Sequence, residues 1–318
     1  MEIRMKENAK AKPKVLRLLI ALILALGMTA CNQEGTSDSS ALRTLTDPSG
    51  AQITVPEEID TVAVLAPSLA ETVVALGYGD EIQAYDTASV GLEGLKEDAI
   101  VLDMASPDME QLVDLRPDVL LVTNMTLYDQ ENPYQALIDM GVCVACVPTS
   151  DSIADIESDI AFVASVFGAE EKGQELIDDM QGEIDRIAAI GETITEKKSV
   201  YFEISAAPSM YSFGDGVFLN EMLEIIGAKN ILASESGWLG VTEEAVVNAD
   251  PDVILTNVNY IEDPVGEILS RPGWEEVTAV RDGNVYYIDN MASSLPDHNV
   301  VKALAEMAAA VYPEYYGA

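Results

Sequence analysis

The sequence contains one histidine, His298, and three cysteines among its 318 residues. Protein sites for free zinc or manganese usually combine several histidines with carboxylates, so capture of a bare transition-metal ion is disfavoured. There is also no second histidine for a general base, and the motifs of serine hydrolases, phosphate-binding loops and zinc peptidases are missing. We therefore expect a protein that is not an enzyme, with a hydrolase built on paired carboxylates as the remaining catalytic alternative.

Lysine and arginine are scarce: 17 of them stand against 55 acidic residues, for a formal net charge of −38. Such a surface repels nucleic acid and anionic lipid head groups, so no nucleic-acid partner is expected. The chain nevertheless begins with a basic segment, MEIRMKENAKAKPKVLR, which leads into an apolar run from Leu18 to Ala30. This run is shorter than the about 20 residues that cross a bilayer, and a basic segment before a short apolar core is typical of a secretory signal.

The apolar run ends in the letters MTAC, which resemble a lipobox with Met28 in place of the usual leucine. In a lipobox the cysteine is lipidated and becomes the mature N-terminus. We therefore predict a signal peptide over residues 1–30, lipidation of Cys31 and a flexible polar tether over residues 31–43. A secreted protein with a free Cys31 is the alternative. The predicted location is extracytoplasmic, with the chain held at the cell membrane by its lipid anchor.

The other two cysteines, Cys143 and Cys146, have the spacing of a metal-binding or redox motif. They fall in a short, β-branched apolar run over residues 142–147, which predicts a buried strand. Residues three apart on a strand point to opposite faces, so these thiols cannot share a zinc ion or form an unstrained disulfide. We expect both to be core thiols.

A long helix is predicted over residues 169–192. Its apolar residues recur at helical spacing in one stripe, and acidic residues occupy the opposite face. Gly168 and Gly191 end the preceding helix and this one. A helix of this length reaches about 33 Å, which is the width of a small domain. The pattern therefore predicts a rod that joins two domains.

Short apolar strands alternate with helices on both sides of the long helix. This alternation is typical of a mostly parallel sheet covered by helices on both faces. The predicted fold class is α/β, with two doubly wound lobes, one over residues 44–168 and the other over residues 193–318. Polar loops follow the strands in each lobe, so we expect a ligand cleft between the lobes.

The two predicted lobes also share sequence. The segment LRPDVLLVTN of the first lobe is matched by ADPDVILTN in the second, and each indicates a helix end, a proline and a buried strand. Glu71 lies six residues before Gly77, and Glu221 lies six residues before Gly227. The repeat indicates that the lobes are related to each other.

Six short segments, taken together in their order and spacing, resemble those of a known protein family. They are VLAPSLAE (residues 64–71), SPDME (106–110), LRPD (115–118), FLNEMLEIIGAKN (218–230), RPGW (271–274) and NVYYID (284–289). With them the chain resembles, from about Leu45 to Pro313, the solute-binding proteins of ABC importers for ferric siderophores, haem and cobalamin. That class has the periplasmic-binding-protein fold with a single inter-lobe helix. The resemblance implies capture of a chelate between the lobes and its delivery to a permease, without catalysis or a cofactor.

In this class one surface glutamate on each lobe pairs with arginines on the two permease subunits. The resemblance assigns this role to Glu71 in the first lobe and Glu224 in the second, while the internal repeat points instead to Glu221. A carboxylate on a rigid helix suits such a charge-assisted pair. The expected partners are an ABC permease dimer with its ATPase, and the chain itself is expected to be a monomer.

The resemblance also implies positions that contact the ligand. Alignment with cobalamin binders places Met104, Tyr211 and Trp238 where aromatic contacts occur, and Tyr211 and Trp238 fall on predicted loops. Four further residues follow the ends of predicted strands, namely Asn124, Met125, Asn290 and Met291. Tyrosine and tryptophan on loops suit the flat face of a macrocycle or chelate.

The expected ligand is an iron-siderophore or a corrinoid of the cobalamin type. Few basic residues lie near the predicted cleft loops, which favours a neutral chelate over citrate-like or catecholate siderophores. Haem is the alternative within the same importer class, and Met104 or His298 is a metal ligand only in that case. His298 is otherwise expected in the loop before the last helix. A non-transport extracellular sensor or adhesin on the same fold is the second alternative.

Overall fold

The computed structural model describes residues 42–126 and 132–317. Residues 40–318 form one compact unit. The predicted signal peptide, Cys31 and the tether up to residue 41 lie outside the described residues. The first strand begins at Leu42, two residues before the predicted start of the first lobe. Within the described ranges, no helix has both the length and the apolarity needed to cross a bilayer.

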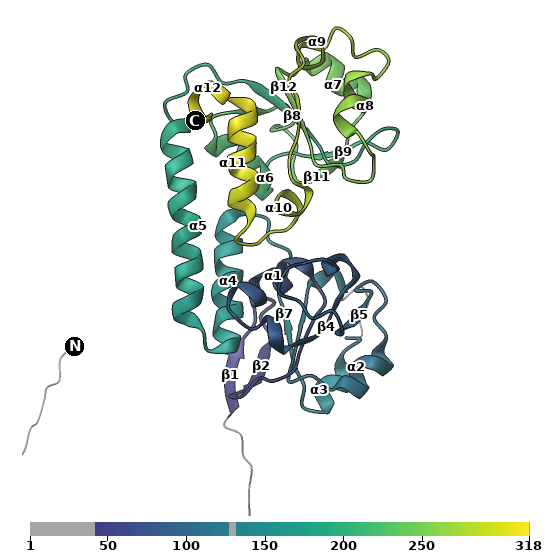
Figure 1. Ribbon diagram of the computed structural model, residues 1–318, viewed down its shortest axis with the longest axis vertical. Coiled ribbons are helices and arrows are strands. Elements are labelled where there is room, and N and C mark those ends of the chain that lie inside the picture. The colour runs from purple at the N-terminus through teal and green to yellow at the C-terminus, as the bar shows by residue number, and fades with distance from the viewer. Residues whose placement is uncertain (1–41, 127–131, 318) are drawn as a thin grey trace, which may run out of the picture. The chain divides into compact units, whose positions relative to one another are not determined.

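The N-terminal lobe is built on a five-stranded parallel sheet in the order β5-β4-β3-β6-β7 (Figure 1). Its strands are β3 (Val62–Val64), β4 (Ile82–Asp86), β5 (Ile100–Leu102), β6 (Val119–Val122) and β7 (Cys143–Cys146). The connecting helices are α1 (Pro67–Ala75), α2 (Met109–Leu115) and α3 (Gln135–Asp139). A hairpin of β1 (Leu42–Thr46) and β2 (Gln52–Pro56) packs beside β7.

Helices cover both faces of this sheet. Val64 of β3 packs with Val73 of α1 on one face, and Leu65 packs with Leu112 of α2 and Leu137 of α3 on the other. Every residue of β3 and β6 is buried, as expected for parallel strands covered on both sides. The lobe is therefore doubly wound, as predicted.

The C-terminal lobe contains a four-stranded parallel sheet in the order β10-β8-β12-β13. The strands are β8 (Ser199–Glu203), β10 (Lys229–Asn230), β12 (Val253–Thr256) and β13 (Val285–Tyr287), with a separate antiparallel pair of β9 (Tyr211–Phe213) and β11 (Trp238–Gly240). The helices are α6 (Phe218–Ile225), α7 (Glu243–Ala249), α8 (Pro264–Leu269), α9 (Thr278–Asp282), α10 (Asn290–Ser294), α11 (Val300–Val311) and α12 (Pro313–Tyr316). α6 and α11 pack on one face of the sheet, and α7 and α8 pack on the other.

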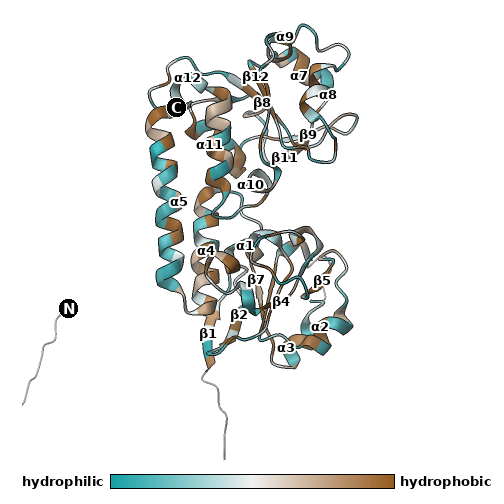
Figure 2. Cartoon of the chain, in the orientation of Figure 1, coloured by the Kyte–Doolittle hydropathy of each residue, from teal (hydrophilic) through white to brown (hydrophobic). Residues whose placement is uncertain are grey.

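Two helices, α4 (Ile153–Phe167) and α5 (Glu170–Gly191), pack against each other alongside both lobes (Figure 1). Figure 2 shows many hydrophilic residues along α5, while its buried residues face the core of the C-terminal lobe. The sequence placed all of α4 in the N-terminal lobe. Ile153, Ile156 and Ile160 of its first half instead join the core of the C-terminal lobe, and the residues that join the core of the N-terminal lobe, among them Val163 and Phe167, come from its second half. Both helices therefore link the two lobes.

Gly191 allows α5 to approach α6 closely. A Cβ atom at this position would lie 2.1 Å from the carbonyl oxygen of Ile225, which is too close for any side chain. The end of α5 is therefore held against the end of α6 by backbone contact. Gly191 is the last helical residue of α5, and the role that the structure gives it is one of packing.

Cys143 and Cys146 lie on opposite faces of β7, as predicted. Cys143 belongs to the core cluster on the α1 face and Cys146 to the cluster on the α2 face. Both thiols are free and buried, and burial raises the pKa of Cys143 to about 12 and that of Cys146 to about 11. Among the described residues no group of histidine, cysteine and acidic side chains is arranged to hold a metal ion.

The repeated sequence builds the same joint in both lobes. Arg116 at the end of α2 and Asp250 at the end of α7 both have φ of 47°, the left-handed conformation that stops a helix. Two residues later, the Asp118 carboxylate accepts a hydrogen bond from the backbone of Thr61 at 2.9 Å, and Asp252 accepts one from Ser199 at 2.8 Å. Each aspartate thereby ties its strand to the start of the neighbouring strand.

Candidate functional site

A cavity of about 260 Å³ lies where the two lobes meet. Its floor is formed by the loops that follow β3, β4, β5, β6 and β7, which is the edge at which parallel α/β sheets usually bind ligands. Residues of α4 form one side. The C-terminal lobe contributes Ser294, the last residue of α10, and Leu295 and Pro296 after it. The predicted cleft between the lobes therefore contains a formed cavity at its inner end.

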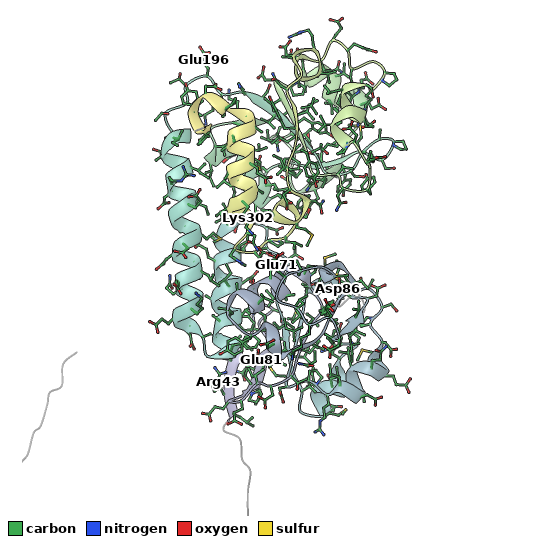
Figure 3. All side chains as sticks on the ribbon, in the orientation of Figure 1. Arg43, Glu71, Glu81, Asp86, Glu196 and Lys302 are labelled. Atoms are coloured by element: carbon green, nitrogen blue, oxygen red, sulfur yellow. The ribbon has the colours of Figure 1, made fainter. Side chains whose placement is uncertain are left out.

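Two carboxylates line this cavity. Asp86 is 2% exposed and accepts hydrogen bonds from the backbone of Ala88 at 2.8 Å and of Met104 at 2.7 Å, so it holds the loops around it (Figure 3). Asp159 of α4 accepts a 2.6 Å hydrogen bond from the Ser150 hydroxyl. Loss of hydration raises the pKa of Asp159 to about 6. No lysine or arginine stands among the described residues that line the cavity.

The predicted contact residues of the N-terminal lobe lie at or beside the cavity. Met104 and Met125 both line it, and Met125 is 44% exposed. Asn124 does not line it. The side-chain oxygen of Asn124 accepts a hydrogen bond of 3.3 Å from the backbone of Thr149, so this residue ties together two loops that form the floor.

Tyr211 and Trp238 lie on the same antiparallel strand pair of the C-terminal lobe, where Tyr211 is opposite Gly240 and Trp238 is opposite Phe213. They lie on β9 and β11, which pair antiparallel, so their prediction as loop residues is wrong. Each is 42% exposed, and the Trp238 ring packs edge-on against Phe213 and Phe218, with centroid distances of 5.9 and 6.5 Å. Neither residue lines the cavity described above. Two exposed aromatic rings thus lie on this strand pair, and that of Trp238 is backed by two buried rings.

Asn290 and Met291 begin α10. The Asn290 side chain donates to the carbonyl of Asn257 at 2.7 Å and accepts from Asn259 at 2.9 Å, so it fixes the loop after β12. The cavity is lined instead by the far end of α10 and the residues after it. The sequence analysis missed Ser294–Pro296. No local sequence pattern marks them, because their approach to the cavity depends on how the two lobes pack.

The three candidate glutamates have different surroundings. Glu71 of α1 is half-buried and accepts a hydrogen bond from the Asn299 side chain of the C-terminal lobe, and burial raises its pKa against the opposing effect of Lys302 (Figure 3). Glu221 of α6 accepts a 2.9 Å hydrogen bond from the backbone of Ile153. Glu224 is exposed, and its carboxylate accepts from Asn220 on the same helix at 3.1 Å.

His298 lies in the turn before α11, as predicted, and does not line the cavity. Its Nδ1 atom is 3.9 Å from the carboxylate of Asp297, and burial lowers its pKa. Asp297 is 1% exposed, and the loss of hydration together with the nearby Glu71 raises its pKa to about 8. Asp297 and His298 directly follow Pro296 of the cavity wall, at the contact between the lobes.

Known proteins resemble this chain in sequence and in fold. The model of the family described as periplasmic binding protein matches residues 62–292. The chain is 31% identical over 307 residues to the ABC transporter substrate-binding lipoprotein YvrC of Bacillus subtilis, covering 93% of this chain and 96% of that protein. It is 25% identical over 317 residues to a cobalamin-binding protein of Halobacterium salinarum, covering 92% of this chain and 84% of that protein.

A similar fold occurs in the molybdate-binding protein MolA of Haemophilus influenzae, whose structure was solved with molybdate bound. The two folds match with a TM-score of 0.73 at 22% sequence identity, over 86% of this chain and 93% of that one. At this identity the match is one of fold.

Proposed function

Since the chain belongs to the periplasmic binding protein family and is a substrate-binding protein of an ABC transporter, we propose that its substrate is a metal chelate of the corrinoid type, without net negative charge. The chelate is captured between the lobes outside the cytoplasm and passed to a permease dimer driven by its ATPase. Lipidation at Cys31 anchors the protein to the membrane. No catalytic step is part of this function.

The charge of the cavity is the observation that carries the proposal. Asp86 and Asp159 line it, and its described lining residues include no cation. An oxyanion or a citrate-like chelate that leaves water needs cationic donors to replace its hydration, and carboxylates oppose its entry. Of the two ligands named for the relatives above, cobalamin therefore fits this lining better than molybdate.

The size of the cavity suits one edge of such a chelate. At about 260 Å³ it is smaller than the about 300–1,000 Å³ typical of sites for drug-sized ligands. In Figure 1, β11 lies on the side of the C-terminal lobe that faces the N-terminal lobe. The proposed arrangement places the remainder of the chelate towards Tyr211 and Trp238, where exposed rings stack on a flat macrocycle.

The proposal is tested by calorimetric titration of the purified protein with cyanocobalamin, a neutral ferric trihydroxamate, ferric citrate and molybdate. We expect cyanocobalamin to bind at least tenfold more tightly than either anion, a difference of about 1.4 kcal/mol or more. Tighter binding of ferric citrate or molybdate would overturn the charge argument. Tighter binding of the trihydroxamate would reassign the ligand to the siderophores.

A charge reversal within the cavity sharpens this test. Asp159→Lys places a cation on the wall and is expected to raise the affinity for ferric citrate or molybdate while lowering that for cyanocobalamin. Glu157→Lys, on the same helix but outside the cavity lining, is the matched control and is expected to change neither. Equal effects of the two variants would show that net charge, rather than the cavity, decides selectivity.

A further inference from the structure

Two helices start at the junction of the lobes, and each start is bound by a glutamate from elsewhere in the fold. α4 begins at Ile153, whose backbone N–H donates to Glu221 of the C-terminal lobe at 2.9 Å. The residue before α11 is Asn299, whose side chain donates to Glu71 of the N-terminal lobe. Figure 3 shows Glu71 at this junction, close to Lys302 of α11.

The internal repeat relates these two contacts. Glu71 and Glu221 occupy equivalent positions on α1 and α6, six residues before Gly77 and Gly227. Both glycines have positive φ, 96° and 84°, so the two helices also end in the same way. The partners are equivalent too, since α4 and α11 each follow a loop that lines the cavity. The two contacts are related but not symmetric: Glu71 reaches across to Asn299 of the C-terminal lobe, whereas Glu221 fixes the start of α4, whose Ile153 packs in the C-terminal core before the helix continues into the N-terminal lobe.

Glu221 accepts a hydrogen bond from a backbone N–H that the capping residues of α4 do not satisfy. The first N–H groups of a helix have no partner within the helix. Ser152 and Asp155 form a capping box at the start of α4, which satisfies the N–H groups of Asp155 and Ser152. The Ile153 N–H remains for Glu221. A carboxylate at this position also interacts favourably with the positive end of the helix dipole.

Both contacts lie next to the cavity wall. Ser150 precedes α4 by three residues, and Pro296 precedes Asn299 by three, and both residues line the cavity. A change in either contact therefore moves a segment that bounds the cavity. From this geometry we infer that Glu71 and Glu221 are positioning residues that jointly set the separation of the two lobes across the cavity. The inference rests on the two-lobed binding function proposed above, but not on the identity of the ligand.

The inference is tested on the ligand-free protein by distance measurement between spin labels. Labels are attached at Glu110→Cys on α2 and Glu244→Cys on α7, two exposed positions in different lobes, with Cys31 replaced by serine. Cys143 and Cys146 are buried and stay unlabelled. We expect Glu71→Ala and Glu221→Ala each to shift the distance distribution to longer values and to widen it. The control, Glu157→Ala, removes a carboxylate from α4 and is expected to keep the wild-type distribution.

A second variant distinguishes loss of the Glu71–Asn299 contact from general destabilisation of the fold. Asn299→Ala removes the partner of Glu71 and leaves the glutamate in place, so it is expected to reproduce the distribution of Glu71→Ala, and the double variant is expected to match either single one. Wild-type distributions in Glu71→Ala and Glu221→Ala, or in Asn299→Ala alone, would overturn the inference. Because no ligand is present, failure of the corrinoid proposal would leave these outcomes unchanged.

Discussion

Arg271 forms a bidentate ion pair with Glu203 in the interior of the C-terminal lobe. Its Nη1 atom lies 2.9 Å from one carboxylate oxygen and its Nη2 atom 3.0 Å from the other, and the two side chains are 4% and 1% exposed. The guanidinium also lies 4.4 Å from the ring centre of Trp274 and pairs with Glu267. The RPGW segment that marked the resemblance is thus part of the core that supports β8.

Removing the arginine from this pair should destabilise the lobe strongly. Arg271→Ala leaves Glu203 buried without its counter-charge, and we expect the free energy of unfolding to fall by about 3–5 kcal/mol. Urea unfolding followed by circular dichroism measures this change. Arg281→Ala breaks a solvent-exposed pair with Asp282, 2.9 Å apart, and should leave the stability almost unchanged. Equal losses in the two variants would contradict the assignment of a buried, mutually dependent pair.

The two exposed rings on the strand pair of the C-terminal lobe should contribute directly to ligand affinity. Tyr211→Ala and Trp238→Ala are each expected to weaken binding at least tenfold, about 1.4 kcal/mol, because each removes a partly exposed ring on which the proposed chelate stacks. Calorimetric titration gives the affinity, and melting temperature serves to detect lost folding. Tyr315→Ala, at an exposed tyrosine of α12, is the control. Unchanged affinity in both variants would remove both residues from the site.

Permease docking should depend on Glu224 rather than on Glu221. Glu224 is exposed, whereas the carboxylate of Glu221 already accepts the Ile153 N–H. Glu224→Arg is therefore expected to reduce uptake at least tenfold in cells that carry only this variant, with ligand affinity of the purified protein unchanged. Glu110→Arg tests whether any added positive charge has the same effect. Normal uptake by the Glu224 variant would exclude it as a docking residue.

Asp297 should make the folded state less stable as the pH rises. Its pKa of about 8 exceeds the ordinary value of 3.8, so between these values the folded protein holds a proton that the unfolded chain has lost. The free energy of unfolding therefore falls as the pH rises through this window. Asp297→Asn removes this dependence, and its stability relative to wild type should increase from pH 5 to pH 8 by the order of 1 kcal/mol or more.

Urea unfolding of both proteins at pH 5 and pH 8 measures the difference. Asp282→Asn is the control, because the neighbouring Arg281 holds the pKa of Asp282 below its usual value, outside this pH range. A constant difference between wild type and Asp297→Asn across the two pH values would show that Asp297 ionises normally in the folded protein.

The fold could be predicted from sequence where the pattern is local. The apolar runs of β6 and β12, each after a proline, and the stripe of α5 are visible in the letters and form as expected. The pair of β9 and β11 was missed because each strand has only three residues, too few for an alternating pattern or an apolar run to mark it. The paired residues are 25 to 29 positions apart in the sequence, so no hairpin signal joins the two strands.

The candidate site was predictable only in part, for a related reason. Met125 was found because it follows a predicted strand, and strand ends meet at one edge of a sheet, whereas Met104 was found only through the resemblance to cobalamin binders. Asp159 looks like a solvated acid on an amphipathic helix, and nothing in its neighbours shows that the junction of the lobes partly covers it. Glu71 was likewise assigned as a surface residue, while its bond to Asn299 spans 228 residues and depends on the packing of the lobes.

Because α4 packs in the hydrophobic cores of both lobes, the two lobes should unfold together. Ile156 and Ile160 complete the core of one lobe while Val163 and Phe167 complete that of the other, so neither lobe is self-sufficient. A fragment of residues 193–317 would leave Phe218 and Leu219 without these neighbours and should not fold in isolation. Chemical denaturation of the intact protein should accordingly give a single sigmoidal transition, with both halves melting together.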